Sequence, residues 1–254
     1  MTGALHVSRP FEGAVLMEID CPPSNALGGE VRTRFLEELE AVENDLHVRV
    51  VIITGRGPGF CSGDDLKEAM TRGDDAVGSL NQFGRLLNRI ESLRAPVIAA
   101  VNGYAIGGGL ELSLCCDIRI SSQDAWFLGA GVNVGLMASV YRLPRLIGVG
   151  PAKAMLLTGT RTDAETALRY GLVTAVHPAD QLQDEALALA KRIATRAPLS
   201  VEASKRMIGR AFDMDADESA RASGQELRRL VASHDHKAGL KAFASRQEPV
   251  FTRS

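Results

Sequence analysis

One stretch of the chain, residues 96–117, limits what the sequence can fold into more than any other. It reads PVIAAVNGYAIGGGLELSLCCD, an apolar strand-like run that ends in three consecutive glycines and leads directly to a carboxylate, Glu111. Glycines let backbone N–H groups approach a ligand atom closely, and a helix that begins there points its positive end at the same place. The stretch therefore predicts a site that favours negative charge on a substrate oxygen.

A second candidate donor lies upstream, in the segment VVIITGRGPGFCSGDDL. Residues 50–54 are typical of a buried strand, and residues 60–65 are typical of a tight turn that opens a helix. Two such strand-to-helix turns can aim two backbone N–H groups at one carbonyl oxygen. This arrangement stabilises an oxyanion or an enolate.

Both segments resemble the enoyl-CoA hydratase/isomerase family, also called the crotonase family. The likeness starts at Asn25-Ala26-Leu27 and continues through LTGTRTDAETALRYGLVTAV and AGLKAFASRQEPVF to the C-terminus. It implies that the backbone N–H groups of Ser62 and Gly108 hold the oxygen of a thioester. It also implies that Glu111 is the first of the family's two catalytic glutamates.

The same resemblance implies where coenzyme A binds. Ala26 matches a CoA-binding position, and Phe243 and Arg246 match an aromatic and a basic residue that face the adenine and 3′-phosphate of CoA bound mainly by the neighbouring subunit. The expected assembly is therefore a homotrimer or a dimer of trimers. CoA enters as part of the substrate, and the resemblance implies no separate cofactor. A solvent-exposed role for Arg246 on an amphipathic helix stays open.

The second glutamate of the family has no counterpart here. The matching stretch reads AWFLGAGVNVGLMASVYRLPRLIG, in which alignment on the aromatic residue places Gly131 at the acid's position, whereas alignment on Arg142 implies a shorter loop and places Leu128 there. No Asp or Glu occurs anywhere in residues 125–162. Proton chemistry must therefore rely on Glu111 or on an acid from elsewhere, and a glutamate installed at Gly131 is expected to raise hydration.

Two aspartates follow the first donor segment directly. Asp65 is expected to cap the following helix, and Asp64 is the local candidate for a replacement acid. Ser62 is not predicted to be a nucleophile, because GFCSGD does not match GxSxG and no histidine motif accompanies it. The backbone of Ser62 matters more than its hydroxyl.

Composition fits an ordinary enzyme. The chain has 254 residues, 45% of them hydrophobic, and a net charge of −2, so neither nucleic acid nor an anionic membrane is an expected partner. The N-terminus lacks a charged leader with a long apolar core, which predicts a cytoplasmic location. Four cysteines without CxxC spacing are expected to be small buried hydrophobic residues rather than zinc ligands or disulfides.

Periodicity predicts alternating strands and helices. Strands are expected near 13–19, 49–54, 96–101 and 117–121, and helices near 30–44, 80–93, 151–157, 163–170, 181–196 and from 198 onward. This order indicates an α/β architecture with parallel strands. The resemblance implies a crotonase-like spiral of ββα turns, with residues 1–197 as the core that holds the CoA-thioester site and residues 198–254 as a C-terminal helical oligomerisation region.

The expected reaction is hydration of a 2-enoyl-CoA through an enolate that the two N–H groups stabilise. Glu111 would activate water for attack on C3, and water, Asp64 or Glu111 itself would deliver the proton to C2. Double-bond isomerisation or decarboxylation with one base, CoA-thioester binding with weak catalysis, and thioester hydrolysis remain alternatives. The acyl group is expected to contact residues 68–82 and 132–141.

Overall fold

The computed structural model describes residues 3–71, 73 and 76–254. Its large sheet has six strands, which in spatial order are β1 (Ala4–Ser8), β2 (Ala14–Asp20), β4 (Val50–Gly55), β7 (Val97–Val101), β9 (Ile118–Ser122) and β12 (Ala175–His177). β1 pairs antiparallel with β2, and every other neighbouring pair is parallel. The four predicted strands and the parallel α/β architecture are thus confirmed.

A second, smaller sheet and a strand pair lie beyond the large sheet. Their members are β11 (Thr162–Asp163), β10 (Trp126–Leu128), β8 (Tyr104–Ile106) and β5 (Gly59–Cys61) in one sheet, and β3 (Ala26–Leu27) with β6 (Gly63–Asp64) in the pair. β4, β7 and β9 are each followed by a short strand of the second sheet and then by a helix. The chain therefore repeats strand, strand and helix, and the expected spiral of ββα turns is confirmed.

Helices fill the connections between strands. Before the C-terminal region they are α1 (Gly29–Asn44), α2 (Leu66–Thr71), α3 (Ala76–Ser92), α4 (Gly108–Leu114), α5 (Arg142–Ile147), α6 (Val149–Thr158), α7 (Ala164–Tyr170) and α8 (Leu182–Ala194), with a 3-10 helix η2 (Ala130–Val134). The predicted helices are present, although α3 begins earlier than residue 80. None of the described helices is both long and apolar enough to cross a bilayer.

Both faces of the large sheet are covered. α1, α3 and α4 pack on one face around buried side chains such as Phe35, Leu86 and Leu110. α8 covers the other face, where Ala186 packs with Ile52. Because both faces are buried, the parallel strands read as continuous apolar runs in the sequence. All four cysteines are buried and free, as predicted.

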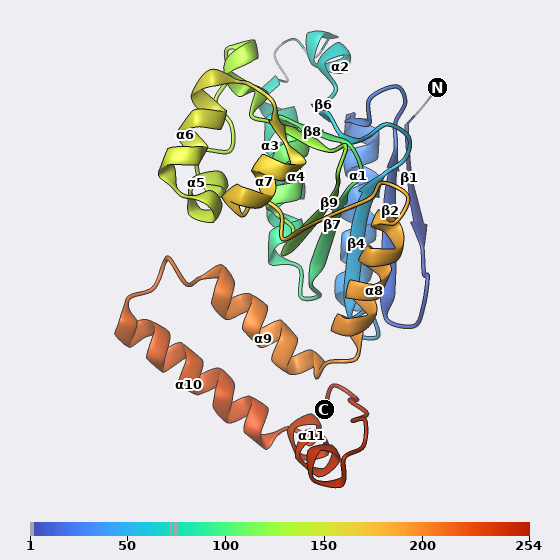
Figure 1. Cartoon of the computed structure of the whole chain (residues 1–254), viewed down its shortest axis with the longest axis vertical. Helices are drawn as coiled ribbons and strands as arrows, with labels where there is room; N and C mark the ends of the chain where they lie inside the picture. Colours follow the sequence, from blue (N-terminus) through green and yellow to red (C-terminus); the bar gives the residue numbers. More distant parts are fainter. Residues whose placement is uncertain (1–2, 72, 74–75) are drawn as a thin grey trace.

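The last three helices extend from the core as a separate layer (Figure 1). They are α9 (Pro198–Gly209), α10 (Ala216–Ala232) and α11 (His234–Ser245). Glu202 on α9 is buried and accepts hydrogen bonds from Arg94 Nη1 at 2.9 Å and from Arg253 Nη2 at 3.0 Å. One buried carboxylate therefore ties α9 and the C-terminal tail to the core.

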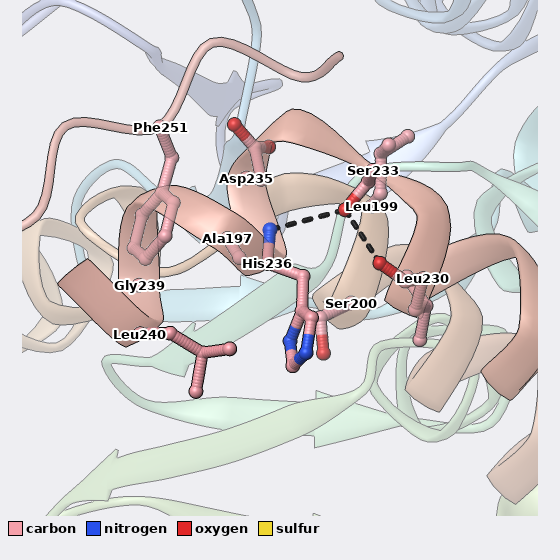
Figure 2. Close-up of a pocket in the computed structure, with 10 residues that line it drawn as sticks. All are labelled: Ala197, Leu199, Ser200, Leu230, Ser233, Asp235, His236, Gly239, Leu240 and Phe251. Carbon is pink, nitrogen blue, oxygen red and sulfur yellow. Dashed lines mark hydrogen bonds between the residues drawn. The ribbon is translucent and has the colours of Figure 1, made fainter.

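A pocket of about 230 Å³ lies between α9, α10, α11 and the tail, and Figure 2 shows the residues that line it. The Asp235 carboxylate beside it accepts hydrogen bonds from the backbone N–H groups of Thr252 at 2.8 Å and Arg253 at 3.0 Å. The ring of Phe251 packs over Gly239 at the edge of this pocket. None of the residues predicted for the thioester site lines this pocket. The hydrogen bonds to Asp235 hold the tail against α11.

Candidate active site

The glycine run opens α4, as the sequence predicts. Gly107 precedes the helix with φ 52° and ψ −111°, a backbone conformation that residues other than glycine rarely adopt. The first N–H groups of a helix have no partner within it, and Gly108 is the first residue of α4. The end of β8 and the start of α4 thus present a backbone donor at one point.

The second donor segment lies directly against this helix start. Ser62 sits between β5 and β6, and a Cβ on Gly63 would come within 2.6 Å of the backbone nitrogen of Gly108. On the other side, a Cβ on Gly109 would approach the carbonyl oxygen of Cys61 to 2.0 Å. Both neighbours of Ser62 therefore pack on the first turn of α4. The fold brings together the two segments that the sequence predicts to carry the donors.

A cleft of about 790 Å³ opens beside Ser62. Ala26 and Ile106 also line it, and the pairing of β3 with β6 sets Ala26 opposite Gly63. The Ser62 hydroxyl donates to Ser24 Oγ at 3.2 Å, so this side chain is already engaged within the cleft wall. The predicted CoA-binding residue and the predicted donor of the first loop therefore share one cleft.

Glu111 lies in the first turn of α4, three positions after Gly108. Residues three apart lie on the same side of a helix, so Glu111 lies on the same side of α4 as Gly108, the predicted donor. Its side chain is 12% exposed and its neighbours Leu110 and Leu112 are fully buried. Glu111 itself is not among the residues that line the 790 Å³ cleft.

Arg142, at the start of α5, contacts Glu111 through a 3.2 Å hydrogen bond from Nη1 to Oε2. Its Nη2 also donates to Glu91 at 2.7 Å and to Asn88 at 3.1 Å. Desolvation lowers the pKa of Arg142, but the hydrogen bond that Arg142 donates to Glu91 and the charges of Glu91 and Glu111 outweigh it and hold that pKa above its ordinary value. Sequence reasoning used Arg142 only to align the loop, because nothing local links residues 31 positions apart.

Around Gly131, where the family's second acid is missing, the backbone is tightly packed. A Cβ on Gly131, within η2, would lie 2.8 Å from the carbonyl oxygen of Leu136 and 3.1 Å from the nitrogen of Ala138. Main chain therefore occupies the space that a side chain at 131 would need. Leu128 ends β10 and pairs with Ile106, whose side chain lines the cleft. This packing argues against the expectation that a glutamate at Gly131 raises hydration.

The two aspartates at the end of β6 have separate roles: Asp64 is its last residue and Asp65 follows it directly. Asp65 Oδ1 accepts from the N–H groups of Lys67 at 2.9 Å and Glu68 at 3.2 Å, which confirms the predicted helix cap. Asp64 Oδ1 accepts from Nη1 of Arg32 at 2.8 Å, and the Arg32 side chain is only 1% exposed. Asp64 therefore balances a buried guanidinium, although it also lines the cleft.

Phe243 and Arg246 are not brought to this cleft. Phe243 is on α11 with 87% of its surface exposed, and Arg246 directly follows the helix with φ 55°. α11 lies at the opposite end of the molecule from α2 and β6 (Figure 1). Within one chain, these two residues and Ser62 do not form one site.

Known proteins similar to this chain point to one family. Residues 11–254 match the family model described as enoyl-CoA hydratase/isomerase. A probable enoyl-CoA hydratase of Mycobacterium bovis is 40% identical over 243 residues, which span 90% of this chain and 85% of that protein. The (E)-benzylidenesuccinyl-CoA hydratase of Thauera aromatica is 38% identical over 89% of this chain and 90% of its own. The crystal structure of an enoyl-CoA hydratase from Bacillus anthracis superimposes with a TM-score of 0.96 at 32% identity, covering 98% of this chain and 99% of that one.

Proposed function

The chain belongs to the enoyl-CoA hydratase/isomerase family, and we propose that it adds water to the double bond of a 2-enoyl-CoA thioester. The observation that carries this proposal is the packing of the Ser62 loop on the first turn of α4, the helix that also bears Glu111. Hydratases among the relatives share most of the chain's length. The reaction requires an oxyanion site and a base, and this packing supports both.

The thioester carbonyl oxygen would accept hydrogen bonds from the backbone N–H groups of Ser62 and Gly108. Attack at C3 moves negative charge onto this oxygen as an enolate, and fixed N–H dipoles stabilise that charge without reorganising. Loss of one such donor costs on the order of a hundredfold to a thousandfold in rate. The positive φ of Gly107 and Gly63 supports this role, because it lets the two loops approach closely.

Glu111 would act as the general base. It accepts a proton from water while the water oxygen bonds to C3 and the double-bond electrons move toward the thioester oxygen. The enolate then collapses and C2 takes up a proton, so that one water is added in total. Since residues 125–162 contain no acid and Asp64 pairs with Arg32, we assign the return of this proton to Glu111 as well.

Coenzyme A would lie in the cleft at Ala26, with its adenine and 3′-phosphate near Phe243 and Arg246 of a neighbouring copy. A guanidinium suits a phosphate. The exposed apolar side chains of α10 and α11 support a homotrimer or a dimer of trimers, since surfaces of this kind are usually covered by another protein. In this assignment residues 198–254 form the oligomerisation region and residues 1–197 the core. A cytoplasmic location, without a nucleic-acid or membrane partner, stays a prediction.

The acyl group is predicted to contact residues 68–82 and 132–141. Within the first range, residues 72, 74 and 75 lie outside the described part of the structure. In the second range, Leu136 and Met137 are 57% and 79% exposed. Apolar side chains open to the solvent favour an apolar acyl group at this end of the site.

Double-bond isomerisation is the second candidate function, because the lack of a second acid suits a reaction with one base. A panel of acyl-CoA thioesters incubated with the purified protein and read by mass spectrometry distinguishes the options. Hydration adds the mass of one water, isomerisation changes retention at constant mass, decarboxylation removes carbon dioxide, and thioester hydrolysis releases free CoA. Binding without turnover of any thioester would refute the enzymatic assignment.

A further inference from the structure

A single arginine joins the proposed base to a second helix. Arg142 on α5 places Nη1 3.2 Å from Glu111 Oε2, while Nη2 reaches Glu91 on α3 at 2.7 Å. The Arg142 side chain is 17% exposed and that of Glu111 is 12% exposed. A contact between two side chains so well shielded from water is weakly screened and geometrically fixed.

We propose that Arg142 is a positioning residue for Glu111: it holds Oε2, leaves Oε1 for water and substrate, and favours the carboxylate after the proton has left. The inference rests on the proposed function, because it assumes that Glu111 is the base. It goes beyond that function in two respects. It assigns the proton that Glu111 takes from water to one carboxylate oxygen, and it gives a role to Arg142, the residue that ends the loop after η2.

The ionisable groups around Glu111 come from three segments of the chain. α5 contributes Arg142, α3 contributes Glu91, and Cys115 directly follows α4. Burial raises the pKa of the Cys115 thiol above its ordinary value, so this neighbour stays uncharged. Glu91 is 49% exposed, and water screens its charge more than that of Arg142. Arg142 therefore places a fixed positive charge directly against Glu111.

Such a field suits a site with one acid. Glu111 must accept a proton from water and then give the same proton to C2. A fixed cation lowers the free energy of the carboxylate that this second transfer restores. Anchoring one oxygen also fixes the other, and a misplacement of about 1 Å in a catalytic group can cost about a hundredfold in rate. The cation thus assists the step for which the family's second acid is missing.

The test compares Arg142→Gln and Arg142→Lys with a matched control on the same helix. Arg145→Gln removes another arginine of α5, which pairs with Asp213 at 2.8 Å on the exposed side. We expect Arg142→Gln to lower kcat by about tenfold to a hundredfold with KM little changed, and Arg142→Lys to recover part of the loss. Arg145→Gln should match wild type.

The pH profile separates a positioning role from a structural one. The pH dependence of kcat should differ between Arg142→Gln and Arg145→Gln, because only the first variant removes the cation that contacts Glu111. A profile of Arg142→Gln that equals that of Arg145→Gln would overturn the proposal.

Infrared difference spectroscopy reads the same carboxyl group without a substrate. The Glu111 signal is assigned by its loss in Glu111→Gln, and its carboxylate stretching band should shift in Arg142→Gln, which loses the hydrogen bond to Oε2, but not in Arg145→Gln. If wild type hydrates no thioester, the proposed function fails, and this band shift alone decides whether Arg142 holds Glu111. If wild type is active and neither readout changes in Arg142→Gln, only the positioning role is wrong.

Discussion

Restoring the missing acid at Gly131 should fail, for a reason visible in the packing. A Cβ at this position would lie 2.8 Å from the carbonyl oxygen of Leu136 and 3.1 Å from the nitrogen of Ala138. Both are backbone atoms, which cannot rotate away as the end of a side chain can. The loop after η2 would have to shift before any carboxyl group could reach the substrate.

The size of this effect follows from the crowding. Forcing extra atoms into a packed site typically costs about 1–3 kcal/mol. In a chain of this length, each kcal/mol lowers the melting temperature by roughly 2–4 °C. Gly131→Ala and Gly131→Glu should both melt several degrees below wild type, and Gly131→Glu should not hydrate crotonyl-CoA faster than wild type.

Leu128→Glu provides the contrasting variant. Leu128 pairs with Ile106 in parallel register, so the two side chains share one face of the small sheet, and Ile106 lines the cleft. A carboxyl group there should raise hydration, because a positioned general acid contributes about a hundredfold or more. Loss of enoyl absorbance and thermal melting are measured on all three variants. Faster hydration by a Gly131→Glu protein that melts with wild type would refute the packing argument.

Three further perturbations test other parts of the site. Gly108→Val places a Cβ 2.7 Å from Phe83 Cζ and should slow hydration by about a hundredfold or more; unchanged melting and activity would contradict it. Asp64→Asn should destabilise the fold by about 1–3 kcal/mol in urea unfolding, because the buried Arg32 loses its closer ion pair and keeps the 3.7 Å contact with Glu68. A slower rate at equal stability would favour Asp64 as an acid. Burial raises the pKa of the Cys61 thiol from 9.0 to about 12, so iodoacetamide should label it only after unfolding, and rapid labelling of the folded protein would argue against burial. Because the unfolded thiol loses its proton at lower pH than the folded one, Cys61 should lower the free energy of unfolding as pH rises from about 9 to about 12.

Much of the fold follows from the sequence because it depends on long, periodic segments. The apolar positions of α1, including Phe35 and Leu39, point to the core as their spacing predicts. The three-residue strands β5, β8 and β10 were not predicted. A strand of that length carries too little alternation to be seen, and it forms because neighbouring turns of the spiral pair with it.

The candidate site divides in the same way. Residues close in sequence, such as Gly108 and Glu111, were predicted together because one helix turn joins them. The contact of Arg142 with Glu111 and that of Asp64 with Arg32 depend on packing between helices and strands distant in the sequence. Charge alone does not predict such pairs, because the sequence contains many acidic and basic residues at similar separations and does not show which of them come into contact.

The central claim is that Glu111 moves the proton in hydration while the two backbone donors hold the thioester oxygen. The most direct measurement compares wild type with Glu111→Gln for crotonyl-CoA hydration, followed by loss of enoyl absorbance, together with affinity for the CoA ester by calorimetry. The predicted result is a rate loss of at least about a hundredfold, with affinity nearly unchanged because the amide keeps the shape of the side chain. Turnover by Glu111→Gln close to that of wild type would contradict the claim.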